Sequence, residues 1–141
     1  MPENRQYFCP VDQSYGKPIK MLTLKSLLRP EVLDQLDTAV NYKFCGSPDC
    51  QVAYFCVTGQ TFAIEDVKVP IFCKDNGEEV PVCYCFGWSR KRILDEIAFS
   101  GMSTAISSIK SHIQAGDCRC DVNNPKGSCC FGDVQHVVQQ V

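Results

Sequence analysis

The chain has 141 residues, which is enough for one domain or two very small ones. Apolar residues make up 45% of the sequence, but this count includes 11 cysteines, and a chain so rich in thiols is typically held together by covalent or metal bonds. The formal net charge of −2 argues against a general nucleic-acid binder, and the apolar runs are too short for membrane insertion.

Residues 1–6 have neither the apolar stretch nor the small-residue cleavage site of a secretory signal. We therefore expect a cytoplasmic protein, whose thiols are kept reduced. Because an odd number of cysteines cannot all pair within one chain, metal ligation is the favoured explanation for them.

The segment up to about residue 80 is predicted to consist of short elements rich in β-structure. Thr23 is a candidate cap for a turn of helix over residues 24–28, and Pro30 suits the first position of another turn. Stretches rich in aromatic and β-branched residues then predict extended structure at residues 42–44, 52–57 and 67–72.

After Pro81 the apolar residues take on helical spacing. Ser89 is a candidate cap for a helix that ends at Gly101, a second helix is predicted over residues 104–115, and a third begins near Gly132. These patterns predict an α+β fold with three helices in its second half.

Two subdomains follow from this change of pattern: a β-rich unit over residues 1–80, packed on a helical unit over residues 81–141. The run Arg90-Lys91-Arg92 directly follows the predicted cap and is interpreted as a solvated helix face. Its alternative interpretation is a docking patch for an acidic partner.

The front half contains a candidate zinc site. Cys45 and Cys50 flank a Gly-Ser-Pro-Asp turn, which tightens the backbone so that both sulfurs can face one ion. Cys9 and Asp12 form the second pair, with a carboxylate where a second thiol is expected. We predict a structural zinc site made of Cys9, Asp12, Cys45 and Cys50. Cys56 is a reserve candidate ligand, although its place in a predicted strand favours a buried thiol.

The back half contains six cysteines around a predicted helical hairpin: Cys83, Cys85, Cys118, Cys120, Cys129 and Cys130. Four thiolates in such an arrangement are typical of a [2Fe–2S] cluster. Only one member of the vicinal pair is expected to be a ligand, because adjacent side chains point apart. Phe86, Trp88 and Phe131 are close enough in sequence to exclude water from such a site.

Motifs in both halves resemble one known family, the amino-terminal domain of the CopZ-type copper chaperones of prokaryotes. The resemblance rests on Cys-Tyr-Cys-Phe at residues 83–86, Asn-Pro-Lys-Gly-Ser-Cys-Cys at 124–130, Cys-Pro-Val-Asp at 9–12, and the block at 42–55. It covers nearly the whole chain and implies one structural zinc and one [2Fe–2S] cluster. It also implies a ferredoxin-like helical back half, similar to bacterioferritin-associated ferredoxin.

The resemblance implies that the cluster ligands are Cys83, Cys85, Cys120 and Cys130. A competing set exchanges Cys118 for Cys120, or Cys129 for Cys130. Soft thiolates select Cu(I), so the cysteines left over could bind copper: Cys118, Cys129, Cys56 and Cys73. This chain departs from the family in having Asp12 in place of a cysteine and in lacking the Met-x-Cys-x-x-Cys copper loop of the second domain.

We therefore predict a redox carrier or metal chaperone rather than a conventional enzyme. In this interpretation the [2Fe–2S] cluster is a one-electron centre, for example reducing Cu(II) to Cu(I), and zinc stabilises the front half. The expected partners are copper ions with a copper transporter or chaperone, or a redox partner protein. The alternative is an electron-transfer or redox- or iron-sensing module with no copper role.

Overall fold

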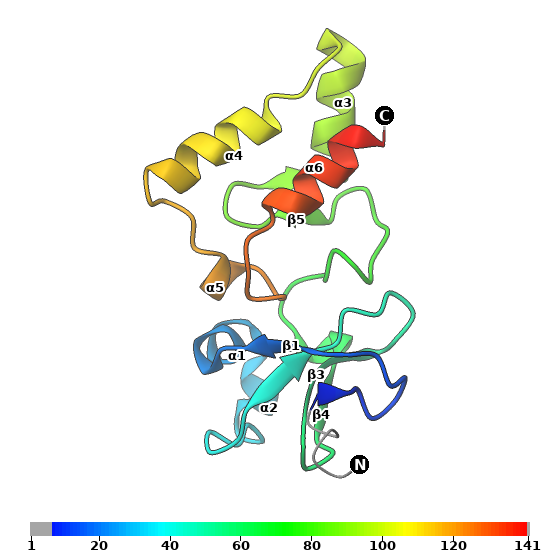
Figure 1. Ribbon diagram of the computed structural model, residues 1–141, viewed down its shortest axis with the longest axis vertical. Coiled ribbons are helices and arrows are strands. Elements are labelled where there is room, and N and C mark those ends of the chain that lie inside the picture. The colour runs from blue at the N-terminus through cyan, green and yellow to red at the C-terminus, as the bar shows by residue number, and fades with distance from the viewer. Residues whose placement is uncertain (1–6, 141) are drawn as a thin grey trace.

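The structure is a computed structural model that describes residues 7–140, so the prediction about a secretory signal concerns residues outside the described part. Figure 1 shows an elongated molecule with a β-sheet and two short helices at one end and the longer helices at the other. The fold is therefore mixed α+β, as predicted. Within the described residues, no helix is long and apolar enough to cross a membrane.

A four-stranded antiparallel sheet with the order β1-β2-β3-β4 forms the front half. Its strands are β1 (Lys17–Ile19), β2 (Tyr42–Phe44), β3 (Val52–Cys56) and β4 (Thr61–Ala63). Successive side chains of a strand point to opposite faces. Tyr54 accordingly lies in the main apolar cluster with the helix residues, whereas Phe55 lies in a separate cluster with three cysteines.

The helices of the front half are α1 (Met21–Leu27) and α2 (Pro30–Leu33), followed after β4 by the 3₁₀ helix η2 (Ile64–Asp66). Pro30 is at the start of α2, as predicted. The prediction that Thr23 caps a helix is wrong, because α1 begins at Met21 and Thr23 is buried within it. The Thr23 hydroxyl binds a carbonyl of the back half instead, a tertiary contact with no local sequence signal.

The strand predicted over residues 67–72 is absent from the structure, where only Val67 forms an isolated bridge, with Leu28. Pro70 lies within this segment and has no N–H to donate to a strand partner. The fourth strand is β4 instead, which pairs with β3 after a turn at Gly59, whose φ of 91° favours glycine.

The back half begins with a hairpin of β5 (Pro81–Cys83) and β6 (Trp88–Ser89), which was not predicted. The helices are α3 (Arg90–Ser100), α4 (Ala105–Gln114), the short α5 (Cys120–Asn123) and α6 (Phe131–Gln139). Ser89 caps α3 by accepting a 3.0 Å hydrogen bond from Arg92 N, and Gly101 ends this helix with a φ of 84°. The predicted cap and the predicted end of this helix are both confirmed. The sequence did not indicate the short helix α5. The division into two subdomains at residue 80 stays a prediction.

The basic run at the start of α3 is only partly a solvated face. Lys91 is exposed and pairs with Asp95 one turn later. Arg90 instead donates hydrogen bonds to the backbone carbonyls of Phe72, Asp75 and Gly77. Arg92 likewise donates to two carbonyls of the β5–β6 turn. The two guanidinium groups therefore hold neighbouring loops.

Candidate metal centres

The predicted zinc ligands Cys9, Asp12, Cys45 and Cys50 lie together, each with one ligand atom within 4.8 Å of the others. The two sulfurs of Cys9 and Cys50 are 3.9 Å apart, and Asp12 Oδ1 lies 3.9 Å from Cys45 Sγ. Two sulfurs bound to one tetrahedral zinc at about 2.3 Å lie about 3.8 Å from each other. The donor set therefore fits zinc in both chemistry and spacing.

Two loops bring these four residues together. Cys45 directly follows β2 and Cys50 lies just before β3, so the zinc knuckle is the connection between two buried strands. The N-terminal loop closes on itself through hydrogen bonds from Cys9 N to Ser14 O and from Gln13 N to Cys9 O. This closure presents Cys9 and Asp12 to the knuckle.

Local hydrogen bonds prepare the Asp12 carboxylate for a cation. Its Oδ1 accepts from the Ser14 hydroxyl at 2.7 Å and from Ser14 N at 3.0 Å. These bonds hold the pKa of the Asp12 carboxyl well below its usual range, so this group is ionised at neutral pH. Burial, by contrast, raises the pKa of the Cys9 thiol to about 12, so a zinc ion displaces a proton there.

Lys74 is a feature of this site that sequence reasoning missed. Its Nζ lies 3.9 Å from Cys45 Sγ and donates hydrogen bonds to the carbonyls of Ser47 and Cys50. Lys74 lies in the segment between the two halves of the chain, and no sequence pattern indicates that it returns to the knuckle.

Five of the six cysteines in the back half lie in one apolar cluster or pack against it. Cys85, Cys118 and Cys120 lie within 4.8 Å of one another, with Cys120 Sγ 3.8 Å from Cys85 Sγ and 3.5 Å from Cys118 Sγ. Cys130 lies beside Cys83 and Cys120 in the buried part of the cluster, but neither Cys83 nor Cys130 belongs to this group of three candidate ligands. The sixth, Cys129, is exposed.

The thiols of this group differ in how readily they lose their protons. Hydrogen bonding to Cys130 lowers the pKa of Cys120 to about 5 and that of Cys83 to about 7. The same hydrogen bonds raise the pKa of Cys130, so its thiol keeps the proton. Burial raises the pKa of Cys118 to about 12. Burial also raises the pKa of Cys85, so two of the five thiols lose their protons more readily than an ordinary thiol and the other three less readily.

Polar donors and aromatic rings surround these thiols. The backbone N–H of Arg119 donates to Cys85 Sγ at 3.2 Å, and the Asn123 side-chain amide donates to the same sulfur at 3.5 Å. Trp88 is buried, and the Phe86 ring stacks on the His112 ring with centroids 4.0 Å apart. Trp88, Phe86 and Phe131 all lie in or against the apolar cluster of these cysteines, and the exclusion of water by them stays a prediction.

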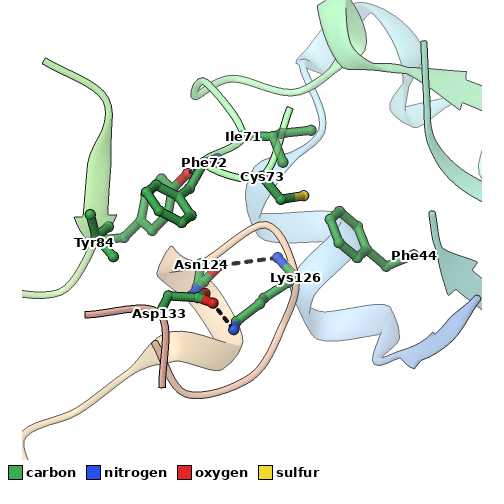
Figure 2. Close-up of a pocket in the computed structure, with 9 residues that line it drawn as sticks. Phe44, Ile71, Phe72, Cys73, Tyr84, Asn124, Lys126 and Asp133 are labelled. Carbon is green, nitrogen blue, oxygen red and sulfur yellow. Dashed lines mark hydrogen bonds and ion pairs between the residues drawn. The ribbon is translucent and has the colours of Figure 1, made fainter. Parts of the chain in front are cut away.

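The remaining cysteines lie apart from both groups. Cys56 is buried in β3 with its Sγ 3.0 Å from the Thr58 hydroxyl. Cys73 is half-buried beside Phe44, and burial raises the pKa of its thiol (Figure 2). Among residues 7–140, neither belongs to a group of three or more candidate metal ligands.

The fold and the front site together define a class, a small zinc-binding domain on an antiparallel sheet. Residues 6–68 match the family model of the CopZ type, described as "Zinc binding domain". The chain is 28% identical over 131 residues to the copper chaperone CopZ of Archaeoglobus fulgidus, an alignment that covers 92% of this chain and 60% of that protein. The chain therefore spans about three fifths of the length of the curated relative it matches.

The X-ray structure of the Archaeoglobus fulgidus CopZ N-terminal domain superimposes with a TM-score of 0.76 at 25% sequence identity. The match covers 92% of this chain and 96% of that domain. The predicted resemblance to the amino-terminal domain of CopZ-type copper chaperones is thus confirmed. The likeness of the back half to bacterioferritin-associated ferredoxin stays a prediction.

Proposed function

We propose that this protein takes part in copper handling and that Cys83, Cys85, Cys120 and Cys130 hold a [2Fe–2S] cluster. The observation that carries the proposal is the gathering of thiols in the back half, with Cys85 Sγ and Cys120 Sγ 3.8 Å apart. The copper role draws on the similarity to a copper chaperone. When bound, a [2Fe–2S] cluster exchanges single electrons, which is the chemistry that reduction of Cu(II) to Cu(I) requires.

Burial supports the choice of ligands from the vicinal pair. Cys130 has no exposed surface and lies in one apolar cluster with Cys83 and Cys120, whereas Cys129 faces solvent. Contacts support Cys120 over Cys118, because Cys120 is buried and touches Cys85, Cys118 and Cys130. Cys118 is half-buried, as Cys85 is, and it too lies within 4.8 Å of Cys85 and Cys120, so it stays the competing ligand.

The chain's own residues would tune this centre. Hydrogen bonds from Arg119 N and Asn123 Nδ2 to Cys85 Sγ withdraw electron density from that sulfur, which raises a reduction potential. Buried Trp88 limits the access of water from the side of the hairpin. In the front half Cys9, Asp12, Cys45 and Cys50 would fill all four ligand positions of a zinc ion, so this zinc is proposed to be structural.

Cys118 is the spare thiol placed best for copper. Its sulfur lies 3.5 Å from Cys120 Sγ and is partly accessible, so a copper ion bound there is adjacent to the redox centre. Reduction of one Cu(II) to Cu(I) takes one electron from the cluster, so a one-electron donor protein must then reduce the cluster again. The proposed partners are therefore a redox partner protein and a copper transporter or chaperone that removes Cu(I).

The test starts from anaerobically prepared protein, and about one zinc and two irons per chain are expected. Reduced with dithionite and freed of excess reductant, the protein should convert Cu(II) to Cu(I), trapped by a Cu(I)-specific chelator. Cys118→Ser should keep its iron and bind less Cu(I), while Cys56→Ser serves as the matched control. Zinc without iron contradicts the cluster proposal. Iron without Cu(II) reduction contradicts the copper role and leaves electron transfer or sensing.

A further inference from the structure

The loop between Cys120 and Cys130 lies against the front half of the molecule. Figure 1 shows this loop, between α5 and α6, reaching towards the sheet beside β1. It contains the Asn-Pro-Lys-Gly-Ser motif of residues 124–128, to which the proposed function assigns no role. Two of the four proposed cluster ligands, Cys120 and Cys130, are at its ends.

Two buried hydroxyl groups of the front half hold the backbone of α5 and of the loop that follows it. The Thr23 hydroxyl, on α1, donates a 2.6 Å hydrogen bond to Asp121 O, and the Tyr54 hydroxyl, on β3, donates a 2.5 Å bond to Pro125 O. Both side chains have no exposed surface, so water is not available to replace these partners. The two bonds therefore fix the distance between the loop and the front half of the molecule.

Gly127 completes the docking by close approach. A Cβ at this position would lie 2.6 Å from Ile19 Cδ1 and 3.4 Å from the Thr23 hydroxyl oxygen. Its φ of 72° also favours glycine. Glycine is thus favoured at this point by the backbone conformation, and a larger residue would also have to move the end of the Ile19 side chain.

The loop is itself stiff. The buried Asn124 side chain donates to Ser128 O at 3.1 Å and accepts from Lys126 N at 3.1 Å. The Lys126 ammonium group pairs with Asp133 of α6 at 2.6 Å, as Figure 2 shows. A displacement of Pro125 is therefore transmitted to both ends of the loop rather than absorbed within it.

One of the front-half residues in these contacts, Tyr54, lies close to the zinc knuckle. Tyr54 belongs to β3, which begins just after Cys50, and its neighbour Phe55 packs in the cluster of Cys9, Cys45 and Cys50. Zinc held by Cys9, Asp12, Cys45 and Cys50 would order the knuckle and with it the start of β3. The position of the Tyr54 hydroxyl would then depend on whether zinc is bound.

We propose that Thr23 and Tyr54 are positioning residues that keep Cys120 and Cys130 beside Cys83 and Cys85, and that they couple the two metal centres. The inference rests on the cluster proposed above. Such coupling is reciprocal, so zinc stabilises the cluster and the cluster stabilises zinc binding by the same factor. The zinc site then has a second role besides stabilising its own half.

The test compares Tyr54→Phe and Thr23→Val with wild-type protein and with two exposed controls, Tyr15→Phe and Thr61→Val. The measured quantities are zinc content, iron content, the paramagnetic spectrum of the reduced cluster, and the rate at which visible absorbance bleaches in an iron chelator. We expect both variants to keep zinc and to lose the cluster about 10-fold faster, with an altered paramagnetic spectrum. The controls should match wild type.

A second arm removes zinc from each protein with a zinc chelator before bleaching. Zinc removal should accelerate cluster loss in wild type but add little in the Tyr54→Phe, Thr23→Val double variant, since the linkage is already broken. If both variants bind iron and lose the cluster at the wild-type rate, the positioning role is overturned while the cluster proposal stands. Wild-type protein that holds no iron overturns the cluster proposal itself, and this inference with it.

Discussion

The ammonium group of Lys74 lies 3.9 Å from the Sγ of Cys45 and donates hydrogen bonds of 2.5 Å to Ser47 O and 3.0 Å to Cys50 O. Three thiolates and one carboxylate around Zn²⁺ have a formal net charge of about −2, so an adjacent cation stabilises the loaded site. Its two carbonyl contacts also fix the knuckle. We expect Lys74→Met to release zinc about 10-fold faster than wild type. Transfer of zinc to a chromophoric chelator measures the rate.

Two variants make this prediction specific. Lys74→Arg keeps the charge and should fall between Lys74→Met and wild type, because its guanidinium group differs in shape. Lys110→Met removes an exposed lysine of α4 and should behave as wild type. If all the proteins release zinc at one rate, Lys74 has no influence on the site.

The parts of the fold that could be predicted from the sequence are those with local causes. Ser89 and Gly101 bound α3 because a side-chain cap and a left-handed backbone act within a few residues of the chain. Thr23 has the same type of local signal, yet its hydroxyl is engaged by Asp121 in the other half of the chain. The signal alone cannot distinguish the two cases, because only the tertiary fold places Asp121 above α1.

The same limit applies to the candidate sites. The spacing of Cys45 and Cys50 around a turn, with Cys9 and Asp12 as a second short pair, was sufficient to predict a group that the structure brings together. Lys74 has no such spacing and reaches the knuckle only through the path of the chain between the two halves. In the back half the sequence left the vicinal cysteines undecided, because burial distinguishes them and is not a local property.

Replacing each vicinal cysteine separately should give opposite results. Cys130 has no exposed surface and contacts Cys83 and Cys120, whereas Cys129 is exposed. We therefore expect Cys130→Ser to lose most of its iron and visible absorbance after anaerobic reconstitution, and Cys129→Ser to keep both. Each variant is the matched control of the other, since the two differ by one position in the same motif. The reverse pattern would transfer the ligand role to Cys129.

Arg90 should contribute more to stability than its position in a basic run indicates. Its guanidinium donates to the carbonyls of Phe72, Asp75 and Gly77 and lies 4.0 Å from the centroid of the Phe72 ring. We expect Arg90→Gln to lower the free energy of unfolding in urea by about 2 kcal/mol.

The neighbouring Lys91 is the control for this effect. Its side chain makes an exposed ion pair with Asp95, so Lys91→Gln should leave the free energy of unfolding almost unchanged. Equal losses in the Arg90 and Lys91 variants would mean that the three carbonyl contacts of Arg90 do not stabilise the loop.

Glu96 should make the junction between α3 and α4 sensitive to acid. Its carboxylate accepts hydrogen bonds from Thr104 N and from the Thr104 hydroxyl, both at 2.6 Å, and these bonds lower the pKa of Glu96 from its ordinary value of 4.5. A carboxyl with a lowered folded pKa stabilises the protein above its unfolded pKa. This stability is lost as the pH falls through the folded value.

Thermal unfolding from about pH 7 to about pH 3 should therefore show a lower Tm for Glu96→Gln at neutral pH, because an amide oxygen accepts these bonds more weakly than a carboxylate. The difference from wild type should begin to shrink below about pH 4.5, where Glu96 of the unfolded chain becomes protonated, and shrink further as the pH falls through the lower folded pKa. Glu79→Gln, which changes an exposed carboxyl outside this junction, is the control. A Tm difference that stays constant across the whole range would show that the Glu96 charge has no part in joining α3 to α4.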